Sequence, residues 1–151
     1  GEGVRPLPPA DLDWFVLLTP TVQLSSEARG GDARGKTAAM FGRLTDANFT
    51  RGALTRKLEA RIRGGGDVPP QFLFNAFDAV AFDAFAGLET HWSTFESLGA
   101  REIHLAGAGP SMFAPVSRKE LGTALQLMLG HRHGYEARLV STWRPPEDLE
   151  C

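Results

Sequence analysis

Hydrophobic residues occur along the chain in two patterns, short apolar runs and longer stretches with a helical repeat. The first run, DWFVLLTP over 13–20, ends at a Thr-Pro pair and predicts a buried strand. The segment that follows it is polar and contains several glycines, which predicts a loop. Within this loop, Ser25 and Ser26 precede a glutamate and are candidate caps for a short helical turn.

Two helices are predicted next, over 36–44 and 51–63. In the second of them, Leu54, Leu58 and Ile62 form one apolar stripe, and most of the other positions are charged, chiefly basic. A basic helix can bind phosphate or nucleic acid, but the chain as a whole is acidic. We therefore predict that the basic side of this helix is a solvated face.

The segment VPPQFLFNAFDAVAFDAFAG over 68–87 is the most apolar helix candidate. Its phenylalanines recur at helical spacing behind a Pro-Pro pair, so a largely buried helix is predicted. Asn75 and Asp78 are three positions apart and would share one face of that helix. Since buried polar groups need partners, these two side chains either anchor a neighbouring loop or line a cleft. The structural anchor is the favoured interpretation.

The rest of the pattern predicts, in chain order, a helix over 88–100, strands over 102–107 and 112–116, a helix over 117–131 and a strand over 135–143. For the last helix, Ser117 is a candidate cap, and Leu121, Leu125 and Met128 form the expected apolar stripe.

This order of elements predicts one α+β domain over residues 1–151. The nearest simple architecture is the ferredoxin-like β-α-β-β-α-β sandwich, with an antiparallel sheet and extra helices in the first crossover. In the last strand, Ala137 and Leu139 occupy alternate positions and are expected to share one face, with Ser141 as a further candidate.

Composition narrows the class of protein. The chain has 151 residues, of which 42% are hydrophobic and 23% charged, and its formal net charge is −2. These values are typical of a soluble globular domain and argue against a nucleic-acid surface or a polybasic membrane patch. The one cysteine, Cys151, excludes an intrachain disulfide and fits a reducing, cytoplasmic setting. No apolar run approaches the roughly 20 residues needed to cross a bilayer.

The sequence LAGAGPSMFAPV over 105–116 contains a glycine-rich motif of the kind that can cradle phosphate. It lacks the Gly-Lys-Ser/Thr ending of a P-loop, and a strand follows it where a phosphate or dinucleotide loop would have a helix. Pro110 also removes one N–H donor. From the residues alone, a turn between two strands is the favoured interpretation. Ser111 has no identifiable base, and the four histidines lack metal-ligand spacing, so no catalytic or metal site is predicted.

Three segments together resemble a known family. They are GEGVRPLPP…WFVLLTPTVQLSS, FLFNAFDAVAF and LGAREIHLAGAGPSMFAPV. In this order they are similar, over nearly the whole chain, to the carboxy-terminal half of the 4-diphosphocytidyl-2-C-methyl-D-erythritol kinases of the GHMP kinase superfamily. The family usually has Asn-Asp-Leu-Glu where this chain has Asn75-Ala76-Phe77-Asp78, and Gly-Ser-Gly-Pro-Thr where this chain has 107–111.

The resemblance implies phosphorylation of a substrate hydroxyl by ATP with magnesium, in non-mevalonate isoprenoid biosynthesis. It implies a position beside the phosphate loop and the substrate for the third family motif, which here is Gly107, Ala108, Gly109, Pro110 and Ser111. It also makes Ser26 a candidate substrate-side hydroxyl. The family's ATP loop, catalytic aspartate and nearby lysine belong to its amino-terminal half. The resemblance therefore implies no catalytic residue or metal ligand in this chain, and it implies that half as the partner.

The chain does not begin with methionine, and the resemblance implies a domain cut from a protein about twice as long. Such a domain is expected to be inactive alone and to expose an apolar docking patch beside 106–111. Two alternatives remain open, since fold does not fix function. One is another GHMP-type kinase with a small-molecule substrate such as homoserine or mevalonate. The other is a non-catalytic interaction domain of the same fold.

Overall fold

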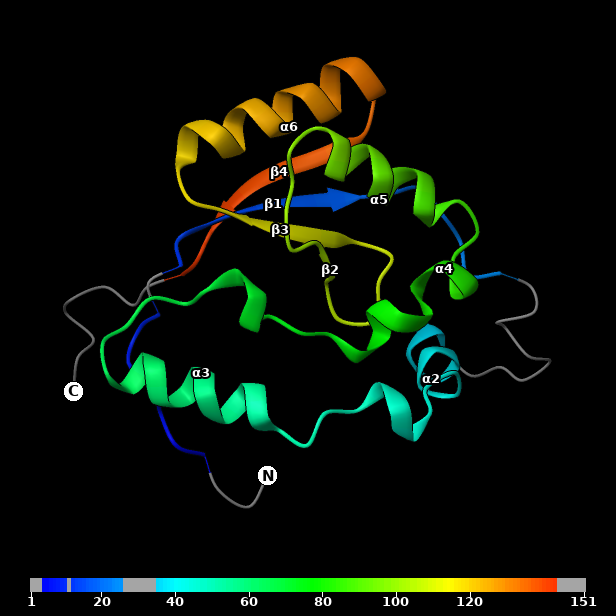
Figure 1. Cartoon of the computed structure of the whole chain (residues 1–151). Helices are drawn as coiled ribbons and strands as arrows, with labels where there is room; N and C mark the ends of the chain where they lie inside the picture. Colours follow the sequence, from blue (N-terminus) through cyan, green and yellow to red (C-terminus); the bar gives the residue numbers. More distant parts are fainter. Residues whose placement is uncertain (1–3, 11, 26–34, 144–151) are drawn as a thin grey trace.

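The fold is built on an antiparallel sheet. We describe it from a computed structural model, in residues 4–10, 12–25 and 35–143. In these residues, four strands form the sheet in the order β2-β3-β1-β4 (Figure 1): β1 (Trp14–Thr19), β2 (His104–Leu105), β3 (Met112–Val116) and β4 (Glu136–Ser141). All three strand pairs are antiparallel. This is the strand order of a ferredoxin-like sandwich, so the predicted α+β class is confirmed.

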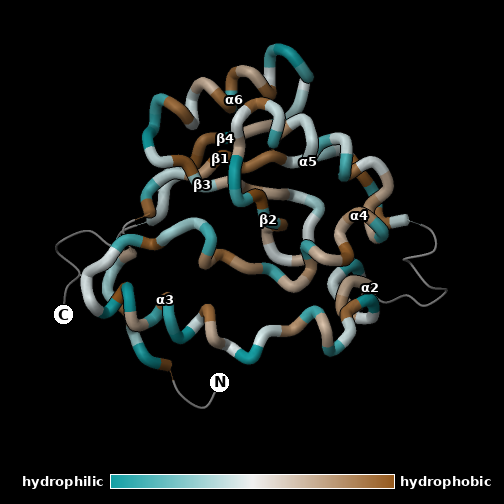
Figure 2. The backbone as a smooth tube through the Cα atoms, viewed as in Figure 1, coloured by the Kyte–Doolittle hydropathy of each residue, from teal (hydrophilic) through white to brown (hydrophobic). Residues whose placement is uncertain are grey.

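The register of the strands separates the two faces of the sheet. Val16 lies opposite Ala114 on β3 and Leu139 on β4, and Leu18 lies opposite Met112 and Ala137. Because directly paired residues point to the same side, these six side chains form one continuous apolar face. Four of the six side chains have no exposed surface. They are those of Val16, Leu18, Met112 and Ala114. The hydropathy colouring of β1 in Figure 2 shows how apolar this central strand is.

Two long helices cover the apolar face. They are α5 (Leu88–Ser97) and α6 (Lys119–His133), and Figure 1 shows both on the same side of the sheet. Phe95 of α5 and Leu125 and Leu129 of α6 belong to the same hydrophobic cluster as β1. The core of the domain therefore lies between the sheet and this helical layer.

The first crossover, from β1 to β2, carries additional elements, in the place where the sequence predicts extra helices. They are α2 (Lys36–Phe41), η1 (Asp46–Asn48), α3 (Ala53–Arg63), η2 (Pro70–Phe72), η3 (Ala76–Val80) and α4 (Ala81–Ala84). The η elements are single 3-10 turns. Within the part of the chain that the structure describes, no helix is both long and apolar enough to cross a membrane.

The predicted continuous helix over 68–87 is wrong. The segment forms η2, then an extended stretch, then η3 and the single turn of α4. The break falls at Asn75, which adopts an extended conformation (φ −133°, ψ 119°) and caps η3 by accepting a hydrogen bond from the N–H of Phe77. Asparagine competes with helical hydrogen bonding through such local contacts. Phe74 is consequently 53% exposed, although helical spacing predicts a buried position.

Two details of α6 also differ from the prediction. Its N-cap is Arg118, with no side-chain capping hydrogen bond, so Ser117 lies one residue too early to cap the helix. The buried stripe runs through Gly122, Leu125 and Leu129, whereas Leu121 is 46% exposed. The helix lies close to the sheet at Gly122, where only glycine fits. A Cβ atom there would lie 2.4 Å from Cδ1 of Leu139.

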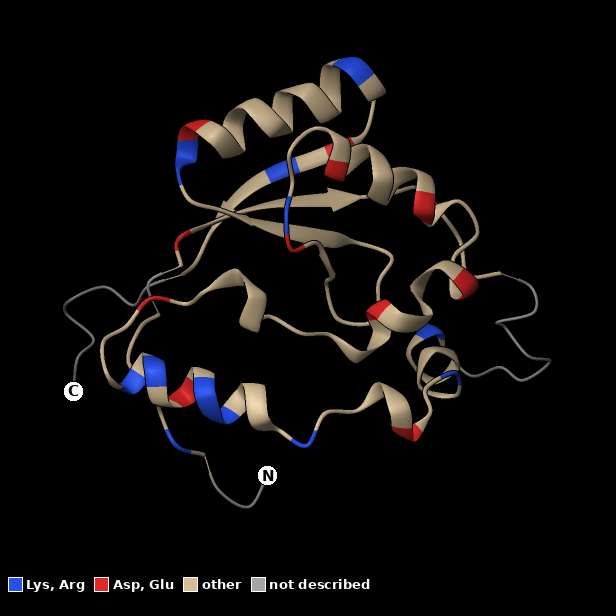
Figure 3. Ribbon diagram, viewed as in Figure 1, with Lys and Arg blue, Asp and Glu red and all other residues tan. Residues whose placement is uncertain are grey.

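The predicted solvated face of the basic helix is confirmed. Leu54, Leu58 and Ile62 of α3 are half-buried, and the arginines and lysine between them are exposed. Figure 3 shows these basic residues gathered along α3. Their ion pairs are local, from Arg61 to Asp67 and from Arg63 to Glu59.

Candidate functional site

The glycine-rich segment 106–111 is the connection between β2 and β3. Its two ends are tied by a hydrogen bond of 2.8 Å from the N–H of Ala106 to the carbonyl of Ser111. Inside the loop, the N–H of Gly109 donates to the carbonyl of Ala106 at 3.3 Å. The favoured prediction of a turn between two antiparallel strands is thus confirmed.

The two glycines of the loop serve different purposes. Both have positive φ, 64° at Gly107 and 66° at Gly109, a region that glycine adopts without strain. A Cβ at Gly109 would lie 3.1 Å from both Leu105 and Phe85, so this position is also closely packed. A Cβ at Gly107 would meet nothing within 4 Å. The loop is therefore packed on the core at Gly109 and open at Gly107.

Asn75 holds the loop through its side-chain amide. The Nδ2 group donates to the carbonyl of Leu105 at 2.9 Å and to that of Gly107 at 2.8 Å. The Oδ1 atom accepts the N–H of Phe77 at 3.0 Å. The side chain thus links η3 to both β2 and the loop. Both its nitrogen and its oxygen atom form hydrogen bonds.

Asp78 holds the strand that leads into the loop. One carboxylate oxygen accepts the N–H of Leu105 at 2.8 Å, and the other lies 2.7 Å from Nδ1 of His104. Because a carboxylate only accepts, Nδ1 of His104 carries the proton. Both side chains are mostly enclosed, with 22% of Asp78 and 14% of His104 exposed. Since both oxygens of Asp78 already have a partner, the carboxylate serves as an anchor in this conformation.

Two residues that sequence reasoning did not single out also belong to this site. One is His104, whose Nε2 atom is buried and has no hydrogen-bond partner among the described residues. The other is Lys36, at the first position of α2, whose ammonium group donates to the carbonyl of Gly109. Neither contact follows a local spacing, because the partners are 26 and 73 positions apart.

The remaining predicted residues are placed as follows. Ser26 lies outside the described residues. Ala108, Pro110 and Ser111 are half-buried within the loop. No group of three or more His, Cys, Asp or Glu side chains that could hold a metal ion occurs in the described part of the chain.

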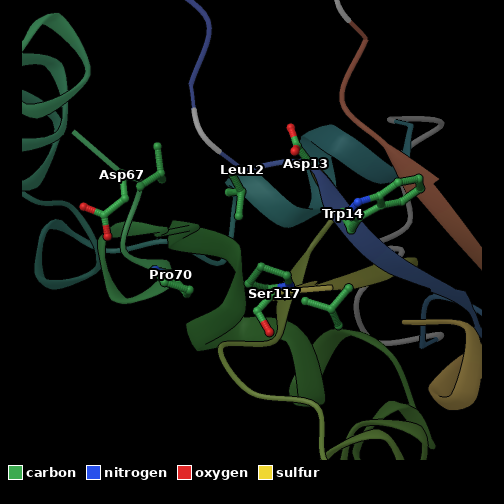
Figure 4. A pocket seen from close by; sticks show the side chains of 9 residues that line it. Leu12, Asp13, Trp14, Asp67, Pro70 and Ser117 are labelled. Atoms are coloured by element: carbon green, nitrogen blue, oxygen red, sulfur yellow. The ribbon is translucent and has the colours of Figure 1, made fainter. Parts of the chain in front are cut away.

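A separate cavity of about 340 Å³ opens at the other end of the sheet. It lies where β1 begins and β3 ends, and Figure 4 shows Trp14, Ser117 and Pro70 around it. The loop 106–111 joins β3 at Met112, the opposite end of this strand from the cavity. None of the predicted site residues that the structure describes lines the cavity.

The fold is similar to that of a solved kinase structure. A crystal structure of 4-(cytidine 5′-diphospho)-2C-methyl-D-erythritol kinase has this fold, with a TM-score of 0.61 at 17% sequence identity, over 89% of this chain and 43% of that one. No family model matches the chain.

The curated relatives in sequence all have the name of one particular kinase. Proteins called 4-diphosphocytidyl-2-C-methyl-D-erythritol kinase, from two strains of Dehalococcoides mccartyi, are 36% identical over 145 residues, and one from a third strain is 34% identical. Each match covers 96% of this chain and 48% of the relative. The chain therefore spans about half the length of these relatives. The chain is similar to the carboxy-terminal half of proteins with this name, and the resemblance seen in its motifs is confirmed.

Proposed function

We propose that the chain forms the carboxy-terminal part of a kinase that transfers the γ-phosphate of ATP to a hydroxyl of 4-diphosphocytidyl-2-C-methyl-D-erythritol. The observation that carries the proposal is the 36% identity to kinases of that name along 96% of the chain. The reaction belongs to non-mevalonate isoprenoid biosynthesis. We assign it to the cytoplasm, where the lone Cys151 would remain reduced.

In this proposal the chain positions substrate and supplies no reacting group. Phosphoryl transfer depends mainly on alignment of the reactants and on neutralisation of phosphate charge, which a magnesium ion provides when bound with ATP. The loop 106–111 forms the substrate side of the cleft, with Gly107 open toward the ligand. Asn75 and Asp78 keep the loop in place from behind. The proposal assigns ATP and magnesium mainly to the amino-terminal half, as the resemblance to the kinase family implies.

The proposed partner of the chain is that amino-terminal half. Two exposed aromatic side chains support a docking surface next to the loop. Phe74, 53% exposed, directly precedes the anchor Asn75, and Phe41, 57% exposed, ends the helix that begins with Lys36. Exposed apolar side chains mark a contact surface where they form one contiguous patch, and the proposal places Phe41 and Phe74 in such a patch. Alone, the chain is expected to have no kinase activity.

The first test is to read the coding sequence immediately upstream of Gly1. The proposal expects an open frame that encodes a glycine- and serine-rich phosphate loop. A start codon directly before Gly1 would contradict it and would favour a non-catalytic interaction domain.

The second test measures ATP-dependent phosphorylation by the protein that contains both halves. It should phosphorylate 4-diphosphocytidyl-2-C-methyl-D-erythritol with a kcat/KM at least about 100-fold above the values for homoserine and mevalonate, since a site built for a large polar substrate discriminates strongly against small analogues. A preference for homoserine or mevalonate would overturn the substrate assignment and retain the kinase class. The 151-residue chain, assayed alone, is the negative control.

A further inference from the structure

One charged side chain reaches the glycine loop from a distant part of the sequence. Lys36 is exposed, yet its ammonium group is hydrogen-bonded to the carbonyl of Gly109. Within residues 4–10, 12–25 and 35–143, no other charged side chain forms a hydrogen bond with the loop 106–111. The position of this charge is therefore a specific feature of the site.

The charge of Lys36 is not neutralised by any described carboxylate. None of the ion pairs in the described residues includes this lysine. The nearest acid of the site, Asp78, has both oxygens engaged by Leu105 and His104. An ammonium group has three N–H donors, and the described contact with Gly109 uses one of them. Two donors and the positive charge are left for another acceptor.

The surroundings of the loop favour an anion as that acceptor. The carbonyls of Leu105, Gly107 and Gly109 would repel an anion, but each already accepts a hydrogen bond from Asn75 or Lys36. The space beside Gly107 is open, since a Cβ placed there would have no neighbour within 4 Å. Among the described residues, the site thus offers an ammonium group that has no carboxylate partner, open space beside Gly107, and three carbonyls that already accept hydrogen bonds.

We infer that Lys36 binds the diphosphate group of the substrate at the glycine loop. The inference rests on the proposed function, because the diphosphate is the strongly anionic part of a 4-diphosphocytidyl substrate. Lysine suits this task, since its ammonium is a compact charge on a flexible stem and binds phosphate oxygens from several directions. In the free protein the ammonium group rests on Gly109, and this contact keeps it beside the loop before substrate arrives.

The kinetic test compares three variants of the protein that contains both halves. Lys36→Met should raise KM for 4-diphosphocytidyl-2-C-methyl-D-erythritol about tenfold with little change in kcat, as expected for loss of one charge-assisted contact made in both ground and transition states. Lys36→Arg, which keeps the charge, should retain most of the affinity. Lys57→Met removes an exposed charge from α3 and is the matched control, expected to leave KM unchanged.

The dependence of KM on ionic strength distinguishes binding of the diphosphate by the charge of Lys36 from a purely structural role of this residue. If Lys36 binds the diphosphate, KM of the wild type rises with ionic strength more steeply than KM of Lys36→Met, because salt screens the contact. If Lys36 only holds the loop, the two slopes are equal and Lys36→Met lowers kcat as well. That result would overturn the inference.

A binding test that needs no activity keeps the inference separate from the proposed function. Inorganic pyrophosphate is titrated into the same protein while the amide resonances of Gly107 and Ala108 are followed by NMR. Shifts in the wild type and in Lys57→Met that disappear in Lys36→Met support the inference. Equal shifts in all three proteins, or none in the wild type, overturn it. A wild type that binds pyrophosphate at the loop but does not phosphorylate the expected substrate would overturn only the proposed function.

Discussion

The glycine loop and the basic helix α3 are the two regions in which the sequence suggests phosphate binding, and the structure holds them in different ways. The loop 106–111 is fixed by residues from far along the chain, since Asn75 and Lys36 are 32 and 73 positions away from the atoms they contact. The polar contacts of α3 stay within six positions, as in the pair of Arg61 with Asp67. Figure 3 shows that the charges of α3 lie along an outer helix.

The difference shows what distinguishes a constructed site from a charged surface. A non-local contact orders two segments of the chain at once. A local ion pair between exposed side chains is available to any helix and is screened by salt. The density of charge is therefore a poor guide to a site. The number of distant elements that converge on one backbone segment is a better one.

The largest effect is expected when the loop loses its amide anchor. Asn75→Ala removes one hydrogen bond to the loop, one to β2 and the cap of η3, and it leaves the carbonyls of Leu105 and Gly107 without that partner. The free energy of unfolding should fall by about 3 kcal/mol, at about 1 kcal/mol for each hydrogen bond. Urea denaturation followed by circular dichroism measures the change.

Asn48 provides a matched control for this prediction. Its Oδ1 atom accepts from the N–H and the hydroxyl of Thr45, three positions away, in the exposed turn η1. Asn48→Ala should therefore cost about 1 kcal/mol, the value of a local cap. Equal losses for the two asparagine variants would show that distance along the chain does not matter here.

The two glycines of the loop give the next largest effect. Gly107→Ala should lower the free energy of unfolding by about 1 kcal/mol, because alanine is strained in the left-handed backbone conformation at this position. Gly109→Ala has the same backbone strain and also places a Cβ 3.1 Å from Leu105 and Phe85. The free energy of unfolding should therefore fall by about 2–3 kcal/mol in total. The difference between the two denaturation midpoints measures the packing. If Gly107→Ala is the more damaging, the loop is packed at the opposite end from the one that we describe.

Much of the sheet and its helical layer could be predicted from the sequence, because their patterns are long and regular. The apolar run of β1 and the turn between β2 and β3 predicted elements that the structure contains. The segment 68–87 could not be predicted in the same way. Its phenylalanines have helical spacing, but Asn75 gains more from three hydrogen bonds outside a helix than it would inside one. Such a tertiary contact overrides local propensity.

The candidate site also contains residues that could be predicted from the sequence and residues that could not. The glycine motif and the pair Asn75 and Asp78 are visible because they are close in sequence and match a family pattern. Lys36 and His104 are not, since only folding brings them to Gly109 and Asp78. A lysine that begins a short helix and a histidine in a two-residue strand carry no local mark of that role.

A smaller effect is expected for Asp78→Asn, which keeps the size of the side chain and one acceptor for the N–H of Leu105. The variant loses the charge-assisted contact with Nδ1 of His104, so about 1–2 kcal/mol of stability should be lost. The amide now donates to Nδ1, and the proton of the neutral imidazole moves to Nε2. Nitrogen-15 NMR of the imidazole ring reports this change of tautomer. A ring that keeps its proton on Nδ1 would contradict the assigned hydrogen bond.

The smallest effect on stability is expected for a substitution in α3, and it tests whether α3 differs from the glycine loop. Arg61→Ala removes an ion pair whose side chains are 45% and 62% exposed, for Arg61 and Asp67 respectively. The loss should be at most about 0.5–1 kcal/mol and should shrink further in high salt, because solvent already screens the pair. Denaturation at two salt concentrations measures it. A loss near that of Asn75→Ala would mean that α3 is fixed as firmly as the loop, and convergence of distant elements would no longer set the site apart from the charged helix.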